Sequence, residues 1–401
     1  MRQYSSIVIC CVLATIALST TSAQQQTMGQ PLDFVQKQYV HGVPYEQARA
    51  LGPAAVPALL QGLQNREISS AWPNIVQTLG FIGDQRALKP LISFLENSVG
   101  EVSSDAFRAL LLVPRALGDL GRENQTIQGS VLEYLTAGAR QNTWTKRVQW
   151  YFRAYRSEIL WRQLSVASVH GLGHLATSAA EEALVGLSKD GPGNLKSDIA
   201  ASLGMLRQLR KVGTAAFFER RAGNAPPPVG TPPPTTVIHD LTVSRHLNET
   251  FSDATADGRL AGATTLLKSN NKGCTDEVVC DAQMKRKNAV SQHGQADDGL
   301  DVIDNIDELS AVFGVAGNIK IVTSINWCAG ASGDYLGCAR NGSNNSILIA
   351  SAADDVFAHE FGHNKGLGHT AKNACDKYIM HPSAASTNAV TLMECISFQK
   401  P

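Results

Sequence analysis

The first half of the chain carries apolar residues at helical spacing. Between residues 30 and 222 they recur three and four positions apart, as on the buried face of an amphipathic helix. The clearest unit covers residues 79–95. A first helix should end near Gly83, and a second should begin at Asp84, because aspartate caps helix N-termini. The second helix would bury one apolar face, made of Ala87, Leu88, Leu91, Ile92 and Leu95.

A Leu-Gly pair recurs in similar apolar settings along this half. The copies are Leu51-Gly52, Leu79-Gly80, Leu117-Gly118, Leu172-Gly173 and Leu203-Gly204. The unit at 79–95 resembles a HEAT-type repeat, in which helix pairs stack into a curved solenoid. We therefore predict an all-α, HEAT-like domain over residues 30–222, with a non-repeating helical bundle as the alternative. Solenoids are usually binding surfaces, so this domain is expected to recruit substrate, dock a protein partner or cover a site elsewhere in the chain.

The pattern changes after a proline-rich stretch at residues 223–236, which we interpret as an extended interdomain linker. Beyond it, short runs rich in β-branched residues alternate with helical patterns. Strands are predicted at 237–247, 318–326, 335–340 and 346–351, and helices at 258–269 and 352–365. Residues 237–401 should therefore form a second, α/β (α+β) domain.

The helix predicted at 352–365 carries candidate metal chemistry. His359, Glu360, His363, Gly366 and His369 form the pattern HExxHxxGxxH. Histidines four apart share a helix face, and the glycine lets the chain turn back to deliver the third imidazole. Three imidazoles with an open fourth position are typical of a catalytic zinc site, and a glutamate after the first ligand is placed to act as general base on water.

This motif resembles that of the metzincin zinc endopeptidases, and Asn364 after the second histidine makes it most similar to the reprolysin-like branch. Met380, in an I-M-x-P run, matches the methionine turn that this family has below the metal. Thr370 stands where reprolysin-like enzymes usually carry aspartate. The resemblance implies one catalytic Zn²⁺, protein or peptide substrates, and a substrate chain paired with the edge strand at 335–340. It also implies no tyrosine ligand, because Pro382 occupies that place.

Composition and the N-terminal sequence indicate the number of domains, the class of partner and the cellular location. The 401 residues suggest two domains, and 35 basic against 35 acidic residues argue against a general nucleic-acid binder. Residues 1–23 are typical of a signal peptide, with Arg2, an apolar run at 7–18 and a small-residue cleavage site ending at Ala23. No stretch is long enough to anchor the chain in a membrane. We predict a secreted or periplasmic protein.

Six cysteines follow residue 270, which in an exported chain indicates three disulfides. We predict pairing between sequence neighbours, although fifteen connectivities are open and a second, thiolate metal site is the alternative. The predicted pairs are Cys274–Cys280, Cys328–Cys338 and Cys375–Cys395. The predicted helical domain holds no cysteine, so a thiolate from it cannot block the zinc.

Two further clusters, one of acidic residues and one of histidines, are interpreted without a ligand. The acidic residues Asp297, Asp298, Asp301, Asp304, Asp307 and Glu308 are interpreted as a solvated face, with calcium as a less favoured ligand because the spacing matches no known loop. His170 and His174 are four apart but lack a third ligand, so packing or surface roles are favoured over a metal.

The sequence thus predicts a secreted zinc metalloendopeptidase. The alternative is a non-catalytic, zinc-containing binding or scaffold protein that uses the helical surface. The intact Glu360 favours the enzyme, since a purely structural zinc module does not need that carboxylate. A third interpretation makes the helical domain an inhibitory pro-region.

Overall fold

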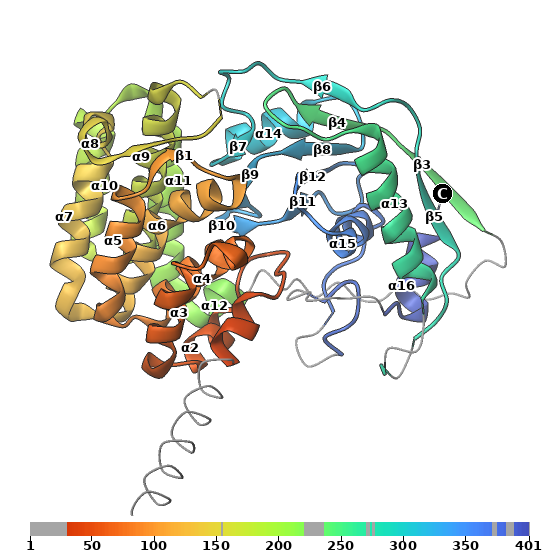
Figure 1. Cartoon of the computed structure of the whole chain (residues 1–401), viewed down its shortest axis with the longest axis horizontal. Helices are drawn as coiled ribbons and strands as arrows, with labels where there is room; N and C mark the ends of the chain where they lie inside the picture. Colours follow the sequence, from red (N-terminus) through yellow and green to blue (C-terminus); the bar gives the residue numbers. More distant parts are fainter. Residues whose placement is uncertain are drawn as a thin grey trace, which may run out of the picture.

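The computed structural model describes residues 30–153, 155–219, 236–269, 273–274, 277–370, 375–381 and 389–400. Residues 30–219 are almost wholly helical and are called the helical half here; residues 236–400 hold the larger sheets and are called the sheet half. The two lie side by side (Figure 1). The predicted signal peptide and residues 223–235 of the predicted linker lie outside the described residues. None of the described helices combines the length and apolar character needed to cross a membrane.

The helical half follows the predicted periodicity. Its α-helices are α2 (Tyr45–Ala50), α3 (Val56–Gly62), α4 (Trp72–Ile82), α5 (Leu88–Glu96), α6 (Ser104–Glu123), α7 (Gln128–Gly138), α8 (Gln141–Arg147), α9 (Ser157–Leu175), α10 (Ser178–Asp190), α11 (Lys196–Val212) and α12 (Thr214–Glu219). A short parallel pair, β1 (Val99–Glu101) and β2 (Gln149–Tyr151), was not predicted. The unit at 79–95 is as expected: α4 ends at Gly83 with a φ of 75°, and the Asp84 side chain accepts from the backbone N–H of Arg86 at 2.9 Å.

Two of the Leu-Gly pairs, Leu79-Gly80 and Leu117-Gly118, mark close crossings between central helices. A Cβ on Gly80 of α4 would lie 2.8 Å from the backbone oxygen of Ala116 in α6. A Cβ on Gly118 of α6 would lie 2.1 Å from the backbone oxygen of Gly171 in α9. Glycine is therefore needed for the backbones of α4, α6 and α9 to touch, and the leucine beside it is buried. The resulting row of helices agrees with the helical prediction, while the HEAT-like repeat stays a prediction.

The sheet half is built from short strands and four described helices. Its elements are β3 (Val237–Leu241), β4 (Val243–His246), α13 (Asp253–Lys268), β5 (Ala282–Arg286), β6 (Ser291–His293), β7 (Val302–Ile303), α14 (Ile306–Gly314), β8 (Ile319–Val322), β9 (Ser324–Cys328), β10 (Ala331–Tyr335), β11 (Gly337–Ala339), β12 (Ser346–Ile349), α15 (Asp354–Asn364) and α16 (Leu392–Phe398). The main sheet has the order β11-β12-β8-β4-β6, parallel except for the antiparallel edge strand β11. The strand predicted at 318–326 is in fact two, because β9 leaves this sheet to pair with β7 and β10.

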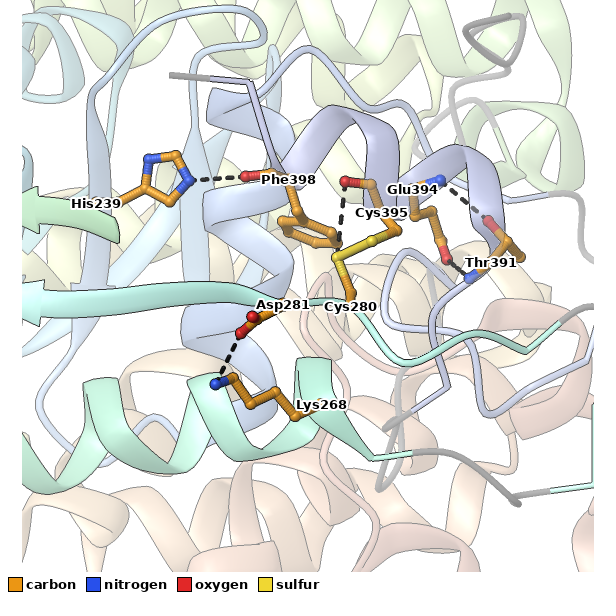
Figure 2. The surroundings of a disulfide bond; sticks show 8 residues. All are labelled: His239, Lys268, Cys280, Asp281, Thr391, Glu394, Cys395 and Phe398. Carbon is orange, nitrogen blue, oxygen red and sulfur yellow. Dashed lines mark hydrogen bonds and ion pairs between the residues drawn. A yellow bond between two sulfur atoms is a disulfide. The ribbon is translucent and has the colours of Figure 1, made fainter. Parts of the chain in front are cut away.

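One predicted disulfide is confirmed and two are wrong. Cys328 pairs with Cys338 as expected. Cys274 pairs with Cys375, and Cys280 with Cys395, across about a hundred residues in each case. Figure 2 shows the reason for the Cys280–Cys395 bond: α16 packs back against the start of the sheet half, where the His239 ring lies 2.7 Å from the carbonyl oxygen of Phe398. Tertiary packing, and not nearness in sequence, decides the pairing.

The acidic cluster is not a solvated face, because much of it is covered by arginines of the helical half. Asp301 and Asp304 are each 1% exposed. Arg115 of α6 lies 2.9 Å from Asp304, and Arg162 of α9 lies 3.1 Å from Glu308. The sequence interpretation failed because the neutralising charges stand more than a hundred residues away. Nothing in this arrangement supports calcium.

Three further pairs join the halves. Arg108 of α6 donates through Nη2 to both carboxylate oxygens of Asp334, at 2.7 and 2.8 Å. His174 lies 3.0 Å from Asp119 in its own half and 2.6 Å from the Ser332 hydroxyl in the other. His170 is fully buried, with its ring edge-on to Trp327. Both histidines are therefore buried at the interface between the halves.

Candidate metal centre

Helix α15 positions two of the predicted metal-binding histidines. Asp354 and Asp355 lie in its first turn, where negative charge suits the helix dipole. His359 and His363 follow four residues apart, and both are at most 9% exposed. The helix ends as Gly366 takes a φ of 85°, a conformation that residues with a Cβ resist. The chain then turns back and brings His369 to the same point.

Backbone carbonyls fix the ring orientation of two histidines. His359 Nδ1 lies 2.6 Å from the carbonyl oxygen of Ile379, and His363 Nδ1 lies 2.8 Å from that of Leu367. A carbonyl oxygen only accepts, so each Nδ1 must carry the proton and donate. Each Nε2 is then left with a free lone pair, which is the form that binds a metal.

Four imidazole nitrogens converge at the site. His369 Nε2 lies 3.2 Å from His359 Nε2 and 3.1 Å from His363 Nε2. His41, from the helical half, was not predicted. Its Nε2 lies 2.8 Å from that of His369 and 3.1 Å from that of His359. Nothing in the sequence pointed to His41, a single histidine that stands 318 residues before His359.

This donor set fits a zinc ion. The lone pairs of His359 and His363 converge on a shared neighbour, and lone pairs so placed repel one another unless a cation lies among them. Tetrahedral zinc with Zn–N bonds of about 2.0–2.1 Å would place its nitrogen ligands about 3.3–3.4 Å apart. The distances above, 2.8–3.2 Å, are close to this edge length. Neutral imidazole is also a preferred ligand of zinc.

Glu360 is a buried carboxylate with no hydrogen-bond partner for either oxygen among the described residues. It is 0% exposed, and this burial raises the pKa of its carboxyl group well above the ordinary value. Its side chain packs on the edge strand β11, where a Cβ on Gly337 would lie 2.6 Å from Oε1. An orphaned carboxylate of this kind needs a partner, either a cation or a water molecule to which it can bind.

Met380, the predicted turn methionine, packs against the helix α15 that carries His359 and His363. It is 0% exposed, and a Cβ on Gly362 of α15 would lie 2.3 Å from its sulfur. The backbone N–H of Thr370 donates to the Met380 carbonyl at 2.9 Å, which ties the segment of the third histidine to this turn. The turn therefore supports the histidines from below. Pro382 lies outside the described residues.

The N-terminal segment that carries His41 runs along the open side of the site. The backbone N–H of Leu336, which directly precedes β11, donates to the carbonyl oxygen of Val40 at 3.0 Å. A cavity of about 450 Å³ opens beside His363 and His369, and Gln208 and Phe217 of the helical half line part of its wall. The helical half thus borders the candidate site directly.

Residues 246–370 match the family model of the reprolysin-like metallopeptidases, family M12B. The matched region covers the sheet half from β4 to one residue past His369, and it includes the whole histidine motif. The resemblance to this family is therefore confirmed for this part of the chain, and it supports a zinc metallopeptidase domain there. The search of curated proteins finds no match to the chain.

Proposed function

We propose that the sheet half is a working zinc-dependent endopeptidase and that the protein is exported from the cell. The observation that carries the proposal is the convergence of the His359 and His363 nitrogens with that of His369, which follows the helix. The same helix, α15, holds the buried carboxylate of Glu360. The match to reprolysin-like metallopeptidases implies zinc and peptide-bond chemistry. The substrate is then a protein or a peptide.

The residues divide the work as follows. His359, His363 and His369 would hold the zinc, with Met380 and two backbone carbonyls fixing their positions. Zinc held in this way supplies a Lewis acid that polarises a carbonyl group and acidifies water. Glu360 accepts a proton from the attacking water and returns it to the leaving amine. Its buried setting, without a competing hydrogen bond among the described residues, keeps it available for both transfers.

The substrate would lie extended beside β11. This strand is the edge of the main sheet, so it offers unpaired backbone groups to an added strand. Two facts support this placement: the Glu360 side chain packs on β11, and the adjacent Leu336 already binds a backbone carbonyl, that of Val40. Backbone pairing would supply affinity, and the neighbouring cavity would receive a side chain.

Export is proposed from the predicted signal peptide at 1–23 and agrees with three disulfides in one half of the chain. We also keep as proposals the division into a helical domain at 30–222, a linker at 223–236 and a peptidase domain at 237–401. We also propose that the helical domain is HEAT-like.

The test is cleavage of unfolded casein by zinc-loaded full-length chain. Four forms are compared: wild type, Glu360→Gln, His41→Ala and the double variant. His41→Ala is included because the His41 ring lies against two of the three proposed ligands. We expect cleavage by the His41→Ala form and its loss when Glu360→Gln is added, with zinc still bound one to one.

The rival is the non-catalytic zinc-binding protein, and one observation favours it. Four histidines around one point resemble a closed structural zinc site more than an open catalytic one. If wild type and His41→Ala both bind one zinc and neither cuts casein, the rival function replaces the peptidase.

A further inference from the structure

We propose that His41 is a fourth zinc ligand, through which the helical half holds the peptidase site in a closed, latent form. The inference rests on the proposed peptidase function. It assigns to the helical half a role that its fold alone does not reveal. The ligand would come from a half that lies wholly outside the matched region at 246–370.

The position of His41 relative to the other three histidines is that of a metal ligand. Its Nε2 lies 2.8 Å from His369 Nε2 and 3.1 Å from His359 Nε2, distances like those among the other three histidines. Its ring also packs edge-on against Tyr335, with the centroids 6.2 Å apart. Helical residues 30–219 contain two other histidines, His170 and His174, and both are buried at the interface between the halves.

The loop around His41 is built to hold the imidazole in place. Gly42 has a φ of 81°, so the chain turns sharply directly after the histidine. The backbone N–H of Val43 then donates to Gln77 Oε1 of α4 at 2.9 Å, and the Tyr39 hydroxyl donates to the carbonyl of Phe34 at 2.9 Å. The loop is therefore fastened to the helical half on both sides of His41.

The same loop is fastened to the sheet half. The carbonyl oxygen of Val40 accepts from Leu336 beside the edge strand, and a Cβ on Gly42 would lie 3.2 Å from the backbone oxygen of Asp334. Asp334 is itself held by Arg108 of α6. The loop thus occupies the start of the path proposed for substrate, while its imidazole fills the position that a catalytic zinc keeps open.

Charge at the interface keeps the closed form populated. Arg108, Arg115 and Arg162 of the helical half meet Asp334, Asp304 and Glu308 of the sheet half, and most of these side chains are nearly buried. The contact is made within one chain, so its effective concentration is high and the closed state dominates in the full-length protein.

The experiment uses full-length protein in which Co²⁺ replaces zinc, because its visible absorption reports the ligands. The forms compared are wild type, His41→Ala and, as a matched control, Gln38→Ala, an exposed residue on the same segment. Acetohydroxamate is the probe, since it binds a metal only at an open position. If about 10% of the wild type is open, the probe should bind His41→Ala about tenfold more tightly than wild type or Gln38→Ala.

Two additions keep the outcome decisive. Free imidazole should restore the wild-type spectrum to His41→Ala, which a misfolded variant would not permit. Casein cleavage by the zinc form should rise at least tenfold in His41→Ala relative to wild type, by the same open-fraction argument.

The inference is overturned if His41→Ala and wild type have the same cobalt spectrum and the same affinity for the probe. A changed spectrum without cleavage keeps the fourth ligand but rejects the peptidase. Cleavage that is equal in all three forms keeps the peptidase and rejects latency.

Discussion

The ion pair between Arg108 and Asp334 should be one of the strongest single contacts between the two halves. Their side chains are 5% and 4% exposed, and Nη2 donates to both carboxylate oxygens. The change Arg108→Met keeps the apolar stem but leaves Asp334 as an unpaired, buried charge. Removing one partner of such a pair costs about 3–5 kcal/mol. Arg207→Met is the matched control, because Arg207 is 61% exposed in its pair with Glu181 and should lose only about 0–1 kcal/mol.

The assay is equilibrium unfolding in urea, followed by tryptophan fluorescence. Trp327 lies at the interface and the other four tryptophans lie in the helical half, so the signal covers both sides of the contact. We expect a lower midpoint for Arg108→Met and recovery of most of the loss in Arg108→Met/Asp334→Leu, which no longer buries a lone charge. If the free energies of unfolding of Arg108→Met and Arg207→Met agree within about 1 kcal/mol, the buried pair does not hold the interface.

Three other predictions follow from single sites. Gly118→Ala places a Cβ 2.1 Å from a backbone oxygen of α9 and should lower the free energy of unfolding by about 1–3 kcal/mol. Gly204→Ala, with nothing within 4 Å, should raise it by about 0.5–1 kcal/mol. Melting temperatures test both variants. Burial lowers the pKa of His170 well below its ordinary 6.5, so below that pH the unfolded chain binds a proton that the folded chain does not. The contribution of His170 to stability should therefore fall by about 1.4 kcal/mol per pH unit as the pH drops, and His170→Phe should change the slope of stability against pH by this amount. In the His41→Ala background, Glu360→Gln should slow casein cleavage by about 10²–10⁴-fold with unchanged zinc content.

Local patterns in the sequence predicted most of the secondary structure. Helical periodicity and the Gly83-Asp84 boundary follow from neighbouring residues, so they are readable without tertiary knowledge. The prediction of one strand at 318–326 missed a break, because the chain changes sheet between Val322 and Ser324. That change depends on strand partners elsewhere in the chain. The two wrong disulfides also depend on tertiary packing. The packing of α16 brings Cys395 to Cys280, and Cys375 meets Cys274 across a similar distance in sequence.

The residues of the candidate metal centre also fall into a locally predictable group and a group that depends on tertiary docking. His359, Glu360, His363 and His369 stand within eleven residues, and one helix and one turn bring them together, so spacing alone was enough. His41 comes from another half of the chain, and its place depends on the docking of that half. The arginines that neutralise the acidic cluster are likewise remote, so the sequence showed the negative charges without the positive ones that cover them.

The chemistry of the interface suits docking that can be reversed. Breaking the pair of Arg115 and Asp304 by mutation leaves a charge in a dry setting, which is costly. Separating the two halves is different, because both charges return to water together and regain their hydration. The exposed pair of Arg156 and Asp297 adds little in either case, since solvent and salt screen it. The ionic contacts therefore specify one relative placement of the halves, the placement that brings His41 to the candidate metal centre.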